Sequence, residues 1–124
     1  MNDNVRTRAH YLQDQGILWE VAIERARQDD KWGEQNHSNG TGTEWTGALV
    51  PWLWNEDRAT HIAMLAKVAC ERKAEYGKLT FLDIALEEIA EAFAETDEQK
   101  LRAELVQSAA VIVNWIGAID RRSR

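Results

Sequence analysis

Four carboxylates and one amide in the C-terminal half of the chain are spaced so that they can ligate a metal ion. Glu87, Glu88 and Glu91 lie within five consecutive residues, and Glu104 and Gln107 follow after an interval of twelve residues. Carboxylate and amide oxygens are the ligands that hard cations such as Mg²⁺ prefer, and Mn²⁺ can substitute in such a set. The spacing therefore predicts a Mg²⁺ site, provided that the chain folds these residues together.

The first three of these residues belong to a predicted helix that Thr80 caps and that continues to about Ala94. The apolar residues Leu82, Leu86, Ile89 and Phe93 share one narrow sector of that helix, and Glu87, Glu88, Glu91 and Glu95 cluster on the other side. Taken alone, an acidic stripe of this kind is typical of a solvated helix face.

The following segment changes that interpretation. The residues from Glu98, which Asp97 can cap, to about Ile119 form a helix that is apolar nearly all round, and such a helix is usually buried. It nevertheless carries Glu104, Gln107 and Asn114, and buried carboxylates and amides are costly unless they are paired or bound to a metal.

A linker of about three residues predicts that these two helices form an antiparallel hairpin. Folding the chain about residues 96–97 places Glu104 opposite the turn that holds Glu88 and Glu91. Three carboxylates that converge in this way repel one another unless a cation lies between them.

Two further helices are expected upstream of the hairpin. One covers about Ile17–Lys31 and ends at Gly33, and the other follows an N-cap at Asn55 and runs to about Tyr76, with Gly77 after it. Residues 36–55 form a long loop that holds three tryptophans, and residues 121–124 form a basic tail. We therefore expect an all-α fold, a bundle of four main helices, in a single domain over residues 1–124.

Composition excludes several classes of function. The net charge of −6 argues against binding to a nucleic acid polymer, although a metal ion can still mediate contact with a nucleotide. Cys70 is the single cysteine, so that no intrachain disulfide can form. The N-terminus is polar, and the longest apolar stretch, residues 109–113, is too short to span a bilayer. A cytoplasmic protein without membrane contact is expected.

The order of the acidic residues resembles a known signature. Glu87-Glu88-Ile-Ala-Glu91 followed by Glu104-Leu-Val-Gln107 resembles the EExxE…ExxD pattern of MazG-like enzymes, with Gln107 where that pattern has Asp. The segment Glu24–His37 (ERARQDDKWGEQNH) resembles the corresponding segment of phage and prophage members, and so does the segment Glu104–Trp115. Together these segments cover most of residues 17–122.

The resemblance implies an all-α MazG-like fold, oligomeric as a homodimer or homotetramer, and hydrolysis of a nucleoside triphosphate between the α- and β-phosphates. The products are the monophosphate and pyrophosphate. The catalytic residues implied are Glu87, Glu88, Glu91 and Glu104; the metal ligands implied are Glu88, Glu91, Glu104 and Gln107. Phage relatives of the MazZ type hydrolyse dGTP, which makes a purine such as dGTP the expected substrate and the cytoplasm of a host bacterium the expected location.

Other side chains could hold the substrate. Lys31 is the first candidate to neutralise the leaving pyrophosphate, with Lys73 among the cations behind it, and Trp32 can stack on a base. Gln28 and Gln35 can read a base edge. The predicted substrate-binding residues are Gln28, Lys31, Trp32, Gln35, Lys73 and Asn114.

Three alternatives remain open on the sequence. The same reaction could act on dUTP, dCTP or a damaged nucleotide. The chain could instead be a catalytically silent helical module for oligomerisation or regulation, which the Gln107 replacement would permit. A di-iron carboxylate protein is disfavoured, because it needs two Glu-x-x-His pairs and the sequence has only Glu34 with His37.

Overall fold

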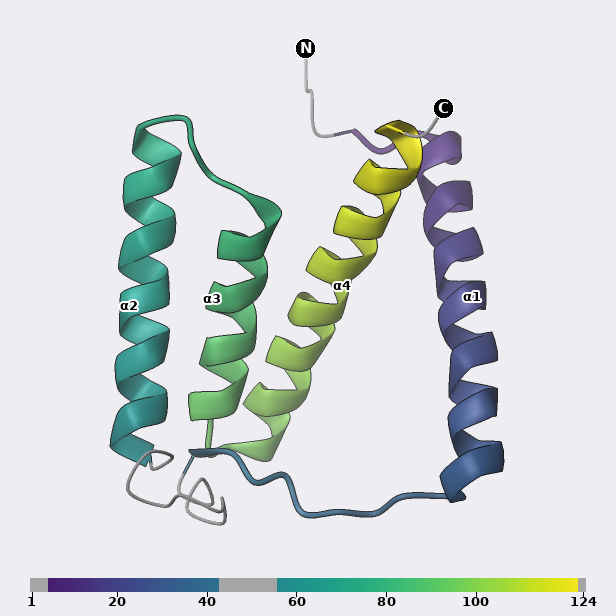
Figure 1. The fold of residues 1–124 in the computed structure, drawn as a ribbon, viewed down its shortest axis with the longest axis horizontal. Helices are drawn as coiled ribbons and strands as arrows, with labels where there is room; N and C mark the ends of the chain where they lie inside the picture. Colours follow the sequence, from purple (N-terminus) through teal and green to yellow (C-terminus); the bar gives the residue numbers. More distant parts are fainter. Residues whose placement is uncertain (1–4, 43–55, 123–124) are drawn as a thin grey trace. The chain divides into compact units, whose positions relative to one another are not determined.

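The computed structural model describes residues 5–42 and 56–122, and within them the regular structure is helical, without a strand. Its four helices are α1 (Arg8–Trp32), α2 (Glu56–Glu75), α3 (Phe81–Ala94) and α4 (Glu98–Arg122) (Figure 1). The expected all-α class with four helices is thereby confirmed. No helix within the described ranges has the length and apolar character needed to cross a membrane.

The chain divides into two compact units. One comprises Met1–His37 together with Val113–Arg124, and the other comprises Ser38–Ile112. The first therefore contains α1 and the last part of α4, whereas the second contains α2, α3 and the first part of α4. The carboxylates Glu87, Glu88, Glu91 and Glu104 all fall in the second unit.

Helix α1 begins at Arg8, nine residues before the predicted start at Ile17. Its N-cap is Thr7, whose hydroxyl accepts a hydrogen bond from the His10 backbone N–H at 3.3 Å, while the Thr7 N–H donates to His10 Nδ1 at 3.0 Å. This is a capping box in which histidine replaces the usual glutamate or glutamine, and for that reason the sequence signal was missed. The predicted end is confirmed, since Gly33 adopts a φ of 72° and its N–H donates to the Asp29 carbonyl at 2.8 Å.

Helix α2 ends one residue before the predicted boundary, in a Schellman turn. The Lys78 N–H donates to the Lys73 carbonyl at 2.8 Å, and the Gly77 N–H donates to the Ala74 carbonyl at 3.2 Å. Gly77 has a φ of 67°, which a side chain at that position would strain. The predicted cap at Asn55 lies outside the described residues.

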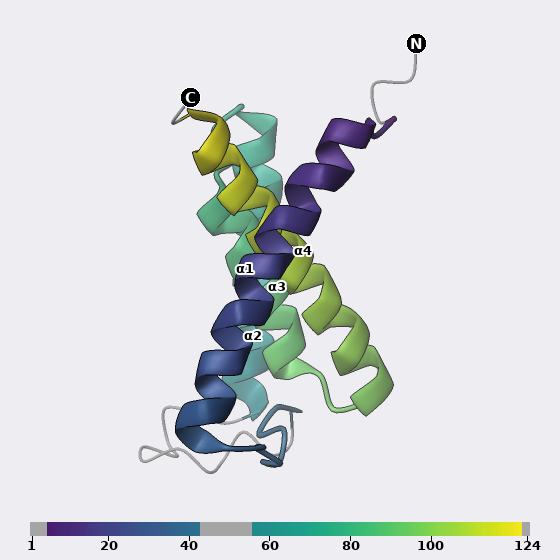
Figure 2. The ribbon, with the colours of Figure 1, turned by 90° about the vertical axis from the view of Figure 1, so that its right-hand side faces the viewer.

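Local signals set the α3–α4 hairpin. The Thr80 hydroxyl accepts the Asp83 N–H, and the Asp83 carboxylate accepts the Thr80 N–H; this capping box confirms Thr80 as the predicted cap of α3. Asp97 caps α4 by accepting the Lys100 N–H at 2.9 Å. The connector Glu95–Asp97 is as short as predicted (Figure 2). Helix α4 continues past the predicted end at Ile119 to Arg122.

Helices α2 and α3 pack against each other through small side chains. Ala66 and Cys70 of α2 are buried, as are Ala85 and Ala90 of α3. The Cys70 thiol donates a hydrogen bond to the Asp83 carbonyl at 3.0 Å, and burial, together with the hydrogen bond and charge of Glu87, raises its pKa to about 12.

The larger apolar side chains lie elsewhere. Leu65 of α2 is 52% exposed, and Leu82 and Leu86, which share the apolar sector of α3, are 63% and 49% exposed. The close approach of α2 and α3 through alanines explains this, because it places the bulkier residues on the outside of the pair. The helix faces that periodicity alone assigns to a core are therefore exposed in the single chain.

Candidate carboxylate site

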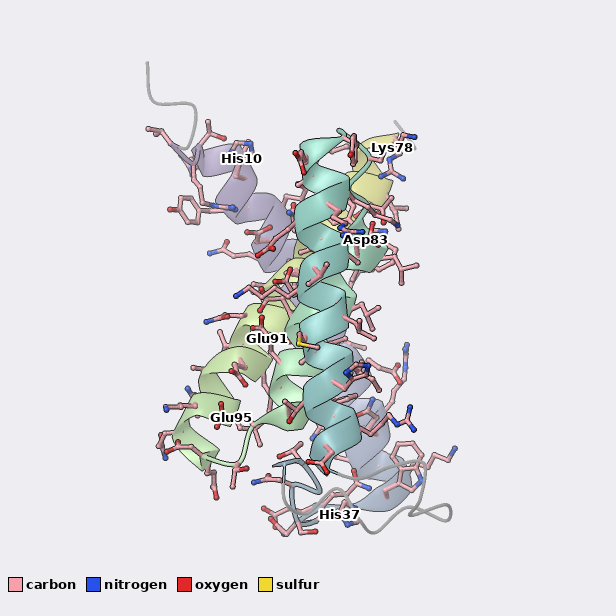
Figure 3. The ribbon with its side chains drawn as sticks, turned by 90° about the vertical axis from the view of Figure 1, so that its left-hand side faces the viewer. His10, His37, Lys78, Asp83, Glu91 and Glu95 are labelled. Carbon is pink, nitrogen blue, oxygen red and sulfur yellow. The ribbon has the colours of Figure 1, made fainter. Side chains whose placement is uncertain are left out.

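The acidic side of α3 is turned inward. Glu87, Glu88 and Glu91 are each half-buried, although their apolar neighbours Leu82 and Leu86 are exposed. Figure 3 shows Asp83, Glu91 and Glu95 in order along α3, from its first turn to its end. The solvated acidic face that is typical of an isolated amphipathic helix is thus not what α3 presents.

Helix α4 supplies the facing carboxylate. Leu101 and Ser108 are buried, and Glu104 lies between them on the same side of the helix, half-buried. The Ser108 hydroxyl donates to the Glu104 backbone carbonyl at 2.9 Å, and the Glu104 carboxylate lies within electrostatic reach of Glu95, Glu91 and Glu88 of the preceding segment. This placement agrees with the hairpin geometry inferred from the sequence.

Two oxygens of this cluster are buried without a hydrogen-bond partner. They are Oε2 of Glu88, on α3, and Oε2 of Glu104, on α4. Burying a charged oxygen without a partner costs free energy, and native proteins rarely leave one in that state. Each helix therefore contributes one carboxylate oxygen whose bonding capacity is unused.

The electrostatics of the two glutamates agree with this geometry. Burial raises the pKa of Glu88, and the negative charges of Glu91 and Glu87 raise it further. Burial also raises the pKa of Glu104, with added contributions from the charges of Glu95, Glu91 and Glu88 and a smaller opposing effect of Lys100. The carboxylates of the two helices are thus close enough to disfavour one another's ionisation.

Such a cluster has the chemistry of a cation site. A divalent cation would give the Glu88 and Glu104 oxygens the partner that they lack and would remove the mutual repulsion. As the side chains stand, no group of three or more His, Cys, Asp or Glu side chains among the described residues is arranged to hold a metal ion. The oxygen donors suit a hard divalent cation in kind, and the side chains would have to change rotamer to surround one.

Gln107 is placed differently from its predicted partners. It is exposed, whereas Glu104 and Ser108 on either side of it in α4 are not. The reason is helical geometry, since Leu101, Glu104 and Ser108 fall on one face and Gln107 lies about 60° beyond Glu104. The structure thus brings Glu88, Glu91 and Glu104 within electrostatic reach of one another and leaves Gln107 at the margin, whereas Glu87 interacts with Cys70 of α2.

The turn after α3 supports the cluster. One oxygen of Glu95 accepts the backbone N–H groups of Thr96 and Asp97 at 3.1 and 3.0 Å, so this carboxylate mainly shapes the turn. The Thr41 hydroxyl donates to the Glu95 carbonyl at 2.9 Å. Gly42 is buried against the same turn, where an added Cβ would lie 2.4 Å from the Thr96 hydroxyl oxygen. No local sequence pattern predicts this contact, because 54 residues separate Thr41 from Glu95.

The predicted cations have partners of their own. Lys73 lies in the same unit as the carboxylates and forms an ion pair of 2.9 Å with Asp83. Lys31 lies in the other unit, with its Nζ 4.8 Å from the centre of the Trp32 ring. Trp32 is 56% exposed, as a residue that stacks on a base would need to be.

Gln28 and Gln35 come together, as two residues that read one ligand would. They line a hollow of about 760 Å³ with Arg25, Asp29, Gly33 and Glu34. Arg25 Nη1 donates a hydrogen bond to Gln28 Oε1 at 2.7 Å, so that the side-chain NH₂ of Gln28 can donate to a ligand. Asn114 does not belong to this group and lines a different cavity with His10. Trp45, Trp52 and Trp54 lie outside the described residues.

Comparisons were made with models of protein families, with curated proteins and with solved structures. None of the three returned a match. The function of the chain is therefore argued from the carboxylate cluster itself.

Proposed function

We propose that the chain is a Mg²⁺-dependent nucleotide pyrophosphohydrolase, which cleaves a nucleoside or deoxynucleoside triphosphate between the α- and β-phosphates. The observation that carries the proposal is the pair of buried, unpartnered oxygens of Glu88 and Glu104 on facing helices. A structural carboxylate would have been paired with a hydrogen-bond donor or left in water. A cation bound between the two helices would supply the partner that both oxygens lack.

The chain's own residues would divide the work as follows. Glu88, Glu91 and Glu104 would hold the ion, and Gln107 would need a change of rotamer to join them. A bound Mg²⁺ supplies a Lewis acid that neutralises phosphate charge and makes water a better nucleophile. Glu87, half-buried beside these ligands, would accept the proton of the water that adds to the α-phosphorus. The bond from the α-phosphorus to the bridging oxygen then breaks, and pyrophosphate leaves.

The reaction and substrate follow from the resemblance of the acidic residues to the MazG-like signature. That resemblance supports α–β cleavage, a MazG-like helical bundle, and a purine such as dGTP as the substrate of a phage-type member. Gln28 and Gln35 could hydrogen-bond to a base, with Trp32, Lys31, Lys73 and Asn114 as further contacts. The exposed leucines of α3 would be covered in a homodimer or homotetramer.

A panel of the eight canonical ribo- and deoxynucleoside triphosphates with Mg²⁺ tests the proposal. The expected products are a monophosphate and pyrophosphate, and orthophosphate as the first product would contradict α–β cleavage. Glu91→Gln should abolish turnover while the helical circular dichroism spectrum is unchanged. Glu71→Gln, which removes the same charge from an exposed position on α2, should retain it. Full activity in Glu91→Gln would refute the metal assignment.

A helical oligomerisation module without catalysis is the second candidate. The observations that favour it are the exposure of Gln107 and of the leucines Leu82 and Leu86. Calorimetric titration separates the two candidates, because the enzyme binds Mg²⁺ and a non-hydrolysable deoxynucleotide, whereas the silent module binds neither and only self-associates.

A further inference from the structure

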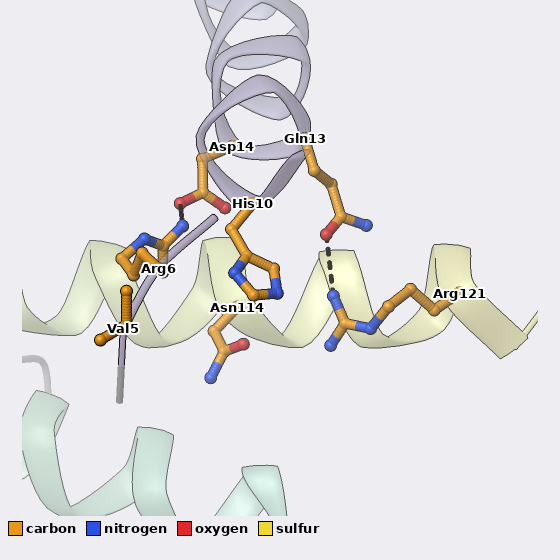
Figure 4. Close-up of a pocket in the computed structure, with 7 residues that line it drawn as sticks. All are labelled: Val5, Arg6, His10, Gln13, Asp14, Asn114 and Arg121. Carbon is orange, nitrogen blue, oxygen red and sulfur yellow. Dashed lines mark hydrogen bonds and ion pairs between the residues drawn. The ribbon is translucent and has the colours of Figure 1, made fainter. Parts of the chain in front are cut away.

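We propose that a second, phosphate-type oxyanion binds in the cavity between the N-terminal end of α1 and the C-terminal part of α4. The cavity has a volume of about 310 Å³ and lies within one unit of the chain. This volume is at the small end of the range for ligand pockets. Arg6, His10, Asn114 and Arg121 are among the residues that line it (Figure 4).

The sign of the charge in the cavity is opposite to that of the chain. The chain carries a net charge of −6, yet two guanidinium groups and one carboxylate line this cavity. The carboxylate, Asp14, is already ion-paired with Arg6, so it holds that guanidinium in place. The positive end of the α1 dipole lies at the same side, and it adds to the preference for an anion.

His10 presents a donor to the cavity. Its Nδ1 accepts the backbone N–H of Thr7 at 3.0 Å, and an accepting Nδ1 cannot carry a proton. The neutral ring must therefore carry its proton on Nε2, the nitrogen that the capping box leaves unused. The hydrogen bond that begins α1 thus also fixes which tautomer faces a ligand.

Arg121 is held by a second hydrogen-bond chain. Its Nη1 donates to Gln13 Oε1 at 2.8 Å, and Gln13 Nε2 donates in turn to the Gly117 carbonyl at 3.1 Å. Arg121 donates only one of its five N–H groups in this chain, so that others are left for a ligand. In Figure 4, His10 and Asn114 lie between Arg6 and Arg121.

The arrangement of donors selects the class of anion. Arginine, histidine and amide groups line the cavity from two helices and from the segment before α1. A planar carboxylate offers two oxygens in one plane, whereas a phosphate offers three or four in a tetrahedron and can use donors from several directions. The ligand is therefore a phosphate, either free or as the terminal group of a small ester.

Titration of the full chain with inorganic phosphate tests this site. EDTA is present so that no divalent cation can attract phosphate to the carboxylate cluster. We expect saturable binding, with acetate binding much more weakly. Arg121→Gln should weaken phosphate binding at least about tenfold, since a charge-assisted hydrogen bond is lost. Arg122→Gln makes the same charge change in the same turn outside the cavity, and it should bind as the wild type does. Tighter binding of dGMP than of phosphate would identify the ligand as an ester.

Asn114→Ala provides a second variant, because the residue is exposed and alanine favours a helix. It should weaken phosphate binding with an unchanged helical spectrum. No saturable binding, equal losses in Arg121→Gln and Arg122→Gln, or equal affinity for acetate and phosphate would overturn the proposal. Glu104→Gln should bind phosphate as the wild type does, because Glu104 does not line this cavity. A negative result for phosphate binding can therefore be told apart from a negative result for the proposed catalysis.

Discussion

Helix α3 carries two kinds of carboxylate, one at its first turn and one along its middle. The Asp83 carboxylate accepts hydrogen bonds from Thr80 and forms an ion pair with Lys73, and these partners lower its pKa. Glu88, five residues later, has an oxygen without a partner, and burial raises its pKa. The comparison teaches that the first carboxylate has a structural task that is complete within the chain. The second has an oxygen that no described residue satisfies, and it is there that the proposed cation would bind.

Among the substitutions that test this comparison, Glu104→Gln should have the largest effect. We expect Mg²⁺-dependent turnover to fall by at least about 100-fold, since even groups that only orient metal ligands contribute about 10–100-fold. In EDTA the same variant should unfold at a higher temperature than the wild type, because a buried, repelling charge is removed. Reduced activity together with reduced metal-free stability would indicate a structural carboxylate instead.

Gly42→Ala tests how much the close contact between Gly42 and the turn after α3 stabilises the fold. The added Cβ would lie 2.4 Å from the Thr96 hydroxyl oxygen and 3.0 Å from two backbone atoms, at a φ of 55°. We expect a loss of about 1–3 kcal/mol in the free energy of unfolding, measured by urea denaturation. Gly40→Ala is the matched control, because its φ is also positive, 72°, but an added Cβ meets no atom within 4 Å. Equal losses in both variants would show that only backbone strain matters.

The pH dependence of the free energy of unfolding should also distinguish Asp83 from Glu88 and Glu104. This is the smallest of the expected effects. Asp83 has a pKa below its ordinary 3.8, so its stabilising contribution is present above about pH 4 and is lost as the pH falls through the lowered value. Glu88 and Glu104 have pKa values above the ordinary 4.5. Their contribution is therefore destabilising, and it develops as the pH rises from about 4.5 through the raised values.

Urea unfolding of the metal-free chain across this range measures both effects. The wild type should lose stability as the pH rises through the raised pKa values, and Glu88→Gln with Glu104→Gln should flatten that slope. An unchanged slope in the double variant would place the titrating groups elsewhere.

Much of the fold could be predicted from the sequence, because short-range signals set it. Gly77, the Thr80–Asp83 capping box and Asp97 each act over a few residues, and the ends of α2 and α3 and the start of α4 lie at or within one residue of their predicted places. The start of α1 was missed because His10 occupies the position where the usual box has a glutamate. The hairpin argument also anticipated the approach of Glu104 to the acidic side of α3.

Other features depend on contacts that no local pattern encodes. The exposure of Gln107 follows from its position about 60° around α4 from Glu104, and the sequence alone does not show which sector of α4 is buried. The exposure of Leu82 and Leu86 follows from the choice of alanines for the α2–α3 contact. The cavity at Arg121 joins residues that are more than 100 positions apart, such as Gln13 and Arg121, so that the role of His10 in it could not be read in advance.

The single cysteine of the chain has a practical consequence for labelling experiments. A buried thiol with a pKa of about 12 is almost entirely protonated near neutral pH, and the thiolate is the form that maleimides and iodoacetamides attack. The native protein should therefore behave as a cysteine-free background. A cysteine introduced at Gln107 or Arg122 could carry a spin label or a fluorophore. Ligand binding near the carboxylate cluster or near the Arg121 cavity could then be followed without replacing Cys70.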